Sequence, residues 1–287
     1  MTLLAMCLKK LSSAYYSDYD RLIAIKSVFY SSSITETTDT CLDRLFQICL
    51  YSNENIVELC RDKYFIARLI RIVQEPLMSE DVGVIGAKSK ALVLTRLFLQ
   101  MRHSLSNEVK KEFALNSDAI LNCLSISKKA IENEEERNYQ VIQFYRTVIQ
   151  ILDMLTVNKE LQQLTLFHDE TIGKTWAKAV VICTEMSLEL YRQHYLSRRS
   201  FLQLSTNSVS FLLRCCFIPE LLPVLCAEDG LVEMLFNLMV TLQFDNPICK
   251  EICRVFTKMF TLMEAPTGFW NAYKEFFDGR DSSGNYL

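Results

Sequence analysis

The feature that most constrains this chain is a pair of apolar residues four positions apart that recurs in four segments along its length. In each segment the pair follows a polar stretch that contains Asp and has the character of a turn. A separation of four places both side chains on one face of an α-helix. The chain is therefore expected to consist of similar helical units that follow one another. The four pairs are Ile66/Ile70, Ile120/Leu124, Ile172/Trp176 and Leu231/Leu235.

Two further apolar segments precede each pair and complete a repeating cycle of a short helix, a middle helix and a long helix. The short segments begin with Asn or Pro, which are favoured at helix starts. Predicted short helices cover Asn53–Cys60, Asn107–Leu115, Asn158–Phe167 and Pro219–Cys226. Predicted long helices cover Cys41–Tyr51, Ala87–Met101, Tyr139–Leu155, Ser208–Phe217 and Pro247–Met263.

The composition favours helices as well. Only seven glycines and five prolines occur in 287 residues, so long stretches have no residue that breaks a helix, whereas a sheet protein needs many turns. Half of the residues are hydrophobic and 23% are charged, which is typical of a folded globular chain. The predicted fold class is therefore all-α.

The three-helix cycle resembles the armadillo repeat, most clearly between Pro219 and Phe260. Asp229-Gly230 stands between the first two helices of that unit, and Asn246-Pro247 opens the third. The resemblance implies an α-α superhelical solenoid of about four to five repeats, as one domain over residues 1–277 with a flexible tail over residues 278–287. The units are more than 50 residues apart, longer than the roughly 40–47 residues of armadillo or HEAT units, so HEAT-like or irregular packing is the nearest alternative.

The extra length is assigned to three places in the chain. One is the loop after Pro76, and another is the acidic stretch Glu132–Arg137, which is interpreted as a solvated loop rather than a recognition element. The third is an extended middle helix that reaches Arg199.

No motif in the sequence predicts catalysis, a cofactor or a metal. Gly173-Lys174-Thr175 has the end of a phosphate-binding loop, but the glycine that should stand five residues earlier is His168. The eleven cysteines, among them Cys49, Cys123 and Cys183, lack the paired spacing of a zinc site and are interpreted as buried, reduced thiols. A non-catalytic protein is therefore expected, and an enzyme with a site assembled across helices is the weaker alternative.

The segment Tyr191–Phe201 is the strongest candidate for a nucleic-acid or acidic-peptide contact. It interleaves basic and aromatic side chains, a mixture suited to stacking on bases or to binding an acidic peptide. The competing interpretation is a helix end whose aromatic residues pack inward and whose basic residues complement the helix dipole. The candidate residues are Arg192, Tyr195, Arg198 and Arg199.

A second candidate is a row of arginines, one in each predicted long helix. If they line the concave side of the repeats they form a basic ladder for an acidic ligand. Gln150 accompanies the third of them, and Trp270, in an aromatic segment interpreted first as a cap for the last repeat, is a further candidate contact. The arginines are Arg44, Arg96, Arg146, Arg214 and Arg254.

These observations favour a protein-interaction scaffold or adaptor within a larger complex. The expected partner is a peptide segment or another helical protein, and a homodimer is possible. The net charge of -3 gives no general attraction for nucleic acid or anionic membrane, so a nucleic-acid- or chromosome-associated role through residues 191–201 is the alternative. No segment has the roughly 20 apolar residues of a membrane span, so a cytoplasmic or nuclear location is expected.

Overall fold

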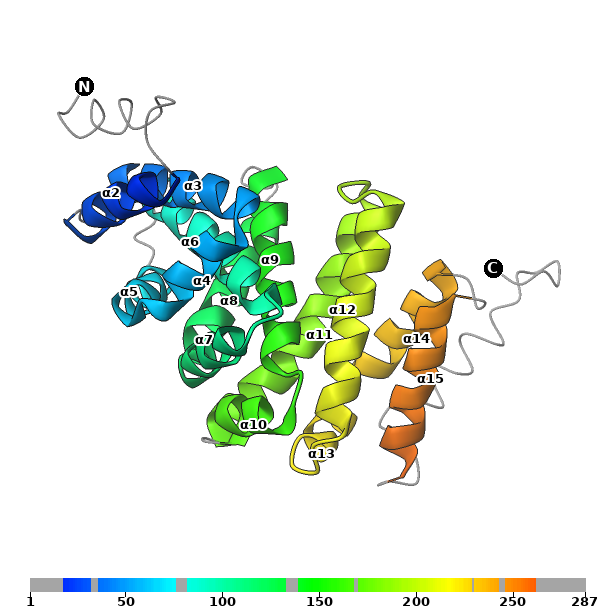
Figure 1. Cartoon of the computed structure of the whole chain (residues 1–287). Helices are drawn as coiled ribbons and strands as arrows, with labels where there is room; N and C mark the ends of the chain where they lie inside the picture. The colour runs from blue at the N-terminus through cyan, green and yellow to red at the C-terminus, as the bar shows by residue number, and fades with distance from the viewer. Residues whose placement is uncertain are drawn as a thin grey trace. The chain divides into compact units, whose positions relative to one another are not determined.

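The structure is a computed structural model that describes residues 18–31, 36–75, 82–132, 139–167, 170–228, 230–242 and 246–261. These residues form fourteen α-helices and one π-helical turn and contain no strand, which confirms the predicted all-α class. The chain divides into two compact units, Met1–Cys123 and Leu124–Leu287, and the division falls inside one helix, α8. Figure 1 shows the helices of both units, coloured along the chain.

The described part of the first unit begins with the helices α2 and α3, which precede the first complete cycle. A short, a middle and a long helix then follow, as the sequence predicts, and the next short and middle helices lead to the boundary. The bounds are α2 Asp18–Ser31, α3 Glu36–Tyr51, α4 Asn53–Arg61, α5 Lys63–Gln74, α6 Val82–Gln100, α7 Ser104–Leu115 and α8 Ser117–Glu132.

The second unit continues the pattern of a short helix followed by two longer ones, although α11, with 23 residues, is longer than α12, with 19. The long helix α9 completes the cycle that α7 and α8 begin, and two further cycles follow. The π-helical turn η1 extends the short helix α10 of the first of these cycles. The bounds are α9 Tyr139–Leu155, α10 Lys159–Gln162, η1 Gln163–Phe167, α11 Glu170–Arg192, α12 Arg198–Cys216, α13 Leu222–Cys226, α14 Leu231–Leu242 and α15 Pro247–Phe260.

Several predicted helix ends are confirmed by their capping groups. Asn158 and Asn246 are N-caps whose side chains accept hydrogen bonds from Leu161 N (2.9 Å) and Ile248 N (3.0 Å). Gly230, before α14, has a φ of +81°, the left-handed conformation that glycine adopts without steric strain. The turn chemistry of the best-matching unit is thus as the sequence indicates.

Other predicted helix starts differ from the structure in their cap or their position. α4 begins at Asn53 as predicted, but its N-cap is Ser52, whose side chain accepts a hydrogen bond from Asn55 N. α7 starts three residues before the predicted Asn107, because His103 is its N-cap and accepts a hydrogen bond from Leu105 N. α13 begins at Leu222, three residues later than predicted, since its proline at the start is Pro223. α12 begins ten residues before the predicted Ser208.

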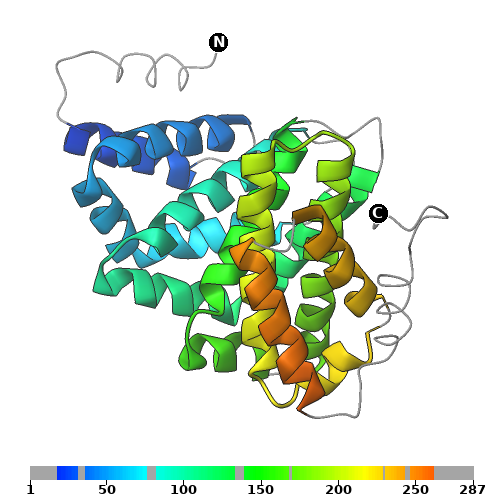
Figure 2. The same ribbon diagram turned by 90° about the vertical axis from the view of Figure 1, so that its right-hand side faces the viewer.

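Successive long helices pack on each other within each unit. In the first unit α3 lies against α6, and in the second α12 lies against both α9 and α15. Figures 1 and 2 show α12 and α15 side by side from two directions. The apolar contacts of the first unit centre on Phe65, whose ring centroid is 5.1 Å from that of Phe29 and 6.2 Å from that of Phe98. All three rings are buried.

The cysteines lie inside these helical layers. The nine cysteines whose side chains the structure describes are free thiols, and each except Cys253 is buried, which confirms the predicted burial of Cys49 and Cys123; the side chain of Cys183 is not among them. Burial raises the pKa of the Cys49 and Cys216 thiols to about 12, so both are protonated at neutral pH. Among the described helices, none combines the length and apolar character that a membrane span requires.

Candidate binding surface

The turn between α11 and α12 has a defined backbone geometry. α11 ends in a Schellman motif: Tyr195 N donates to Leu190 O (2.9 Å), and His194 N donates to Tyr191 O (3.0 Å). His194 occupies the left-handed position of this motif, with a φ of 62°. The expectation that the middle helix reaches Arg199 is therefore wrong, because the chain reverses at His194 and starts a new helix at Arg198, capped by Ser197.

The basic and aromatic residues of the predicted segment fall into a packed group and an exposed group. The Tyr191 and Phe201 rings stack at a centroid distance of 4.1 Å with an interplanar angle of 10°, and Phe201 is buried. Arg192, Arg198 and Arg199 are exposed, as is Tyr195, which is the one large aromatic of the turn that faces solvent. The turn therefore exposes three arginines and Tyr195, while the stacked rings of Tyr191 and Phe201 join its two ends.

A polar face of α9 carries two of the predicted binding residues. Arg146 and Gln150 follow Gln143 at intervals of three and four, and Asp153 continues the row, so the four residues share one helix face. Arg146 donates from one nitrogen to Gln143 Oε1 (3.2 Å) and from another to Gln203 Oε1 of α12 (3.4 Å). The second bond places this face of α9 beside α12.

A matching polar face runs along α12. Arg199, Gln203, Asn207, Ser210 and Arg214 follow at intervals of four, four, three and four. Two members of this row contact the α9 row: Gln203 accepts from the predicted Arg146, and Arg214 pairs with Asp153. We call the two rows together the α9–α12 strip. It extends from the basic turn at Arg199 to the carboxyl end of α9.

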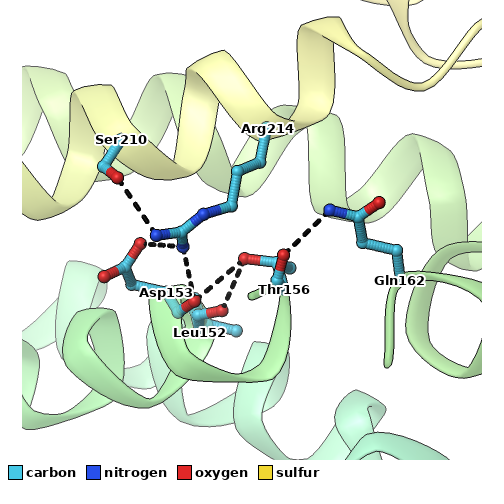
Figure 3. Close-up of polar contacts among 6 residues, drawn as sticks. All are labelled: Leu152, Asp153, Thr156, Gln162, Ser210 and Arg214. Carbon is cyan, nitrogen blue, oxygen red and sulfur yellow. Dashed lines mark hydrogen bonds and ion pairs between the residues drawn. The ribbon is translucent and has the colours of Figure 1, made fainter. Parts of the chain in front are cut away.

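The end of the strip at Arg214 is firmly tied (Figure 3). The Arg214 guanidinium pairs with the Asp153 carboxylate, donates to Asp153 O (2.7 Å) and donates to Ser210 Oγ (3.2 Å). Thr156 Oγ1 donates to Leu152 O (3.2 Å), so two carbonyl groups in the last turn of α9 have side-chain donors. Burial raises the pKa of Asp153, although Arg214 acts in the opposite direction.

The middle of the strip is less constrained. Gln203 is exposed, and Asn207 is half-buried with no side-chain hydrogen bond to any of the described residues. Gln150 is buried, with 6% of its surface exposed, so little of its side chain is accessible to a partner. Gln203 and Asn207 were not among the predicted contact residues, although their four-residue spacing from Arg199 places them on its helix face.

The remaining predicted arginines do not join the strip. Arg44 is an exposed residue of α3, and Arg96 is half-buried in α6; both belong to the first unit. Arg254 is exposed on α15 and pairs with Glu251 of its own helix (2.7 Å). Arg146 and Arg214 alone are brought together, as links between α9 and α12. Trp270 and the tail over residues 278–287 lie outside the described residues, as does nearly all of the acidic stretch 132–137.

The phosphate-loop and cysteine motifs of the sequence take ordinary helical positions in the structure. Gly173, Lys174 and Thr175 lie within α11, so their backbone is helical and does not form a phosphate-binding loop. No group of three or more His, Cys, Asp or Glu side chains in the described part of the chain could hold a metal ion. Cys249 is buried and Cys253 exposed, at four-residue spacing on α15.

Comparisons with protein-family models, with curated proteins and with solved structures found no match to this chain.

Proposed function

We propose that this chain is a non-catalytic scaffold of the armadillo or HEAT type that binds a peptide segment of a protein partner along its long helices. The recurrence of a short helix followed by two longer helices supports this proposal, as does the packing of α3 on α6 and of α12 on α9 and α15. In such repeats each unit covers its neighbour, and the long helices form a continuous lining.

The α9–α12 strip is the observation that carries the proposal. Side-chain amides and guanidinium groups of two adjacent long helices lie in two rows that contact each other through Arg146–Gln203 and Arg214–Asp153. An extended peptide has unpaired backbone N–H and C=O groups, and side-chain amides can both donate to and accept from them. Asn207 and Gln203 are placed to do so, with Arg199 at one end to attract an acidic residue of the peptide.

The proposal is tested by affinity capture from a cell extract followed by mass spectrometry, with nuclease present. The wild-type chain is compared with a double variant, Gln203→Ala with Asn207→Ala. We expect a stoichiometric protein partner on the wild type and a loss of at least about tenfold in its affinity for the variant, which corresponds to roughly 1.4 kcal/mol.

A matched control uses two exposed amides outside the strip, Gln100→Ala with Gln163→Ala, on α6 and η1. This variant should retain the partner. Equal retention by the strip variant and the control variant would refute the strip as the binding surface, and the absence of any nuclease-resistant partner would refute the scaffold itself.

A nucleic-acid contact is the second candidate, favoured by the exposed Arg192, Arg198, Arg199 and Tyr195 at the α11–α12 turn. Binding of this kind would weaken steeply with salt and would be lost in Arg198→Glu with Arg199→Glu. One exposed aromatic residue and a chain of net charge -3 make it the weaker candidate. Nuclease-sensitive capture that depends on these two arginines would move it to first place.

A further inference from the structure

A separate groove opens on the first unit, at the junction of α4 and α5. Its volume is about 520 Å³, and it is lined by six residues contributed by α2, by α5 and by the junction itself. They are Tyr30, Asp62, Tyr64, Ala67, Arg68 and Arg71. No residue of the α9–α12 strip contributes to it.

The acidic residue of the lining, Asp62, already has a cationic partner and a hydrogen-bond donor. Asp62 Oδ2 pairs with Lys26 Nζ (2.5 Å) and accepts a hydrogen bond from the Tyr30 hydroxyl (2.6 Å). Its other oxygen, Oδ1, accepts from Phe65 N (3.1 Å) and caps α5. Burial alone would raise the pKa of Asp62, but the hydrogen bonds from Lys26 and Tyr30 lower it. The carboxylate is therefore a fixed structural element of the groove and stays ionised.

Two arginines line the groove beside this carboxylate. Arg68 lies with its guanidinium carbon 4.9 Å from the centroid of the Phe29 ring, which holds the side chain against the wall. Arg71 is exposed and has no ion-pair partner among the described residues. Burial and the nearby Arg71 both lower the pKa of Arg68, as expected where two guanidinium groups are close together. An anion between them would relieve this repulsion.

An aromatic surface adjoins the two cations. Tyr64 is 83% exposed, and residues 64, 67, 68 and 71 share one face of α5 at helical spacing. Ala67 is small and exposed, so it leaves room between the tyrosine and the arginines. This face therefore presents an apolar contact beside a doubly cationic one, and tyrosine and arginine are the residues enriched where protein interfaces gain most of their affinity.

We propose that this groove is a second docking site, for a short acidic segment of a protein partner that also carries an apolar side chain. A carboxylate of the segment lies between Arg68 and Arg71, where a guanidinium can form paired hydrogen bonds with it. The apolar side chain lies on Tyr64 and Ala67. The Lys26–Asp62–Tyr30 contacts hold the opposite wall in place. The proposal does not depend on the α9–α12 strip.

The test is a selection from a random twelve-residue peptide library on the folded wild-type chain. Counter-selection uses Arg71→Glu, because Arg71 is exposed and its replacement leaves the Arg68 contact with Phe29 intact. We expect the selected peptides to be enriched in Asp or Glu next to an aromatic or aliphatic residue. The best peptide should bind Arg71→Glu and Tyr64→Ala at least about tenfold more weakly than wild type.

Arg44→Glu is the matched control, since it makes the same charge change on an exposed residue of the same unit outside the groove. It should bind the selected peptide within about twofold of wild type, after correction for salt-dependent long-range effects. Circular dichroism melts of all variants establish that each is folded.

Three outcomes would overturn the proposal: no enrichment of acidic residues, equal binding by Arg71→Glu and Arg44→Glu, or failure of the selection while inorganic phosphate alone binds the groove. The last would assign the two arginines to a phosphate group. If capture from extract does not depend on Gln203 and Asn207 but the selected acidic peptide still binds the groove, the proposed function is refuted and this second site is supported.

Discussion

The contact between Arg214 and Asp153 allows a quantitative test of how α9 and α12 are held together. Replacing Arg214 with Met keeps most of the length of the side chain and removes its cation. Asp153 then loses its ion-pair partner, Asp153 O loses a donor at 2.7 Å, and Ser210 Oγ loses a donor at 3.2 Å. The carboxylate is left near the negative end of the α9 dipole, with no cation to balance it.

The burial of the pair sets the size of the effect. The two side chains are 26% and 18% exposed, between a surface pair worth 0–1 kcal/mol and a fully buried pair whose disruption costs 3–5 kcal/mol. We expect Arg214→Met to lower the free energy of unfolding by about 2–3 kcal/mol. Asp153→Asn in the variant background should recover part of this loss, with a coupling energy of about 1–2 kcal/mol in the double-mutant cycle.

Urea unfolding followed by circular dichroism measures all four proteins, at neutral pH and at about pH 4.5. The folded-state pKa of Asp153 is raised, so its ionised form destabilises the fold at neutral pH and this penalty disappears as pH falls. Loss of Arg214 raises that pKa further, so the difference between wild type and Arg214→Met should shrink at acid pH. A loss below about 0.5 kcal/mol, or strictly additive effects, would refute this account.

Four further predictions concern other positions and use the same unfolding assay. Gly230→Ala should lower the free energy of unfolding by about 1 kcal/mol, because Gly230 has a φ of +81°. His194→Gly should raise it by a few tenths to about 1 kcal/mol, because His194 has a φ of 62°. Effects of the opposite signs would contradict these two backbone conformations. Phe65→Ala should cost about 3–5 kcal/mol, since the ring is fully buried, and a loss under about 1 kcal/mol would show that the site collapses. Burial lowers the pKa of Lys88, which donates to Val73 O (2.5 Å), so the folded state releases this proton before the unfolded chain does. Wild type should therefore gain stability relative to Lys88→Met as pH rises from about 7 toward 10, and a pH-independent difference would refute the assignment.

The sequence was informative wherever one local rule determined the structure. Asn246-Pro247 and Gly230 follow from backbone chemistry that acts within a few residues, so α15 and the turn before α14 are confirmed. The start of α12 was missed because nothing local marks the reversal at His194, where histidine occupies a position usually filled by glycine. His103 was likewise not expected as a cap, since Ser, Thr, Asp and Asn are the usual choices.

The candidate sites required tertiary information. Gln203 and Asn207 are ordinary polar helix residues until the contact with Arg146 places their face beside α9. The groove brings Tyr30 next to Asp62 across 32 positions of sequence, and Arg68 and Arg71 resemble a solvated helix face when read alone. Hydrophobic periodicity predicts which faces are buried, but it does not predict which polar faces meet.

The buried cysteines make each unit its own reporter of local opening. A thiol with a pKa near 12 and no solvent access cannot react with an alkylating reagent until its surroundings open, so its labelling rate measures how often they do. Cys49 and Cys60 would report on α3 and α4, and Cys216 on the end of α12. Mass spectrometry after timed labelling could then map, without any engineered probe, which helices yield first and whether a bound peptide slows them.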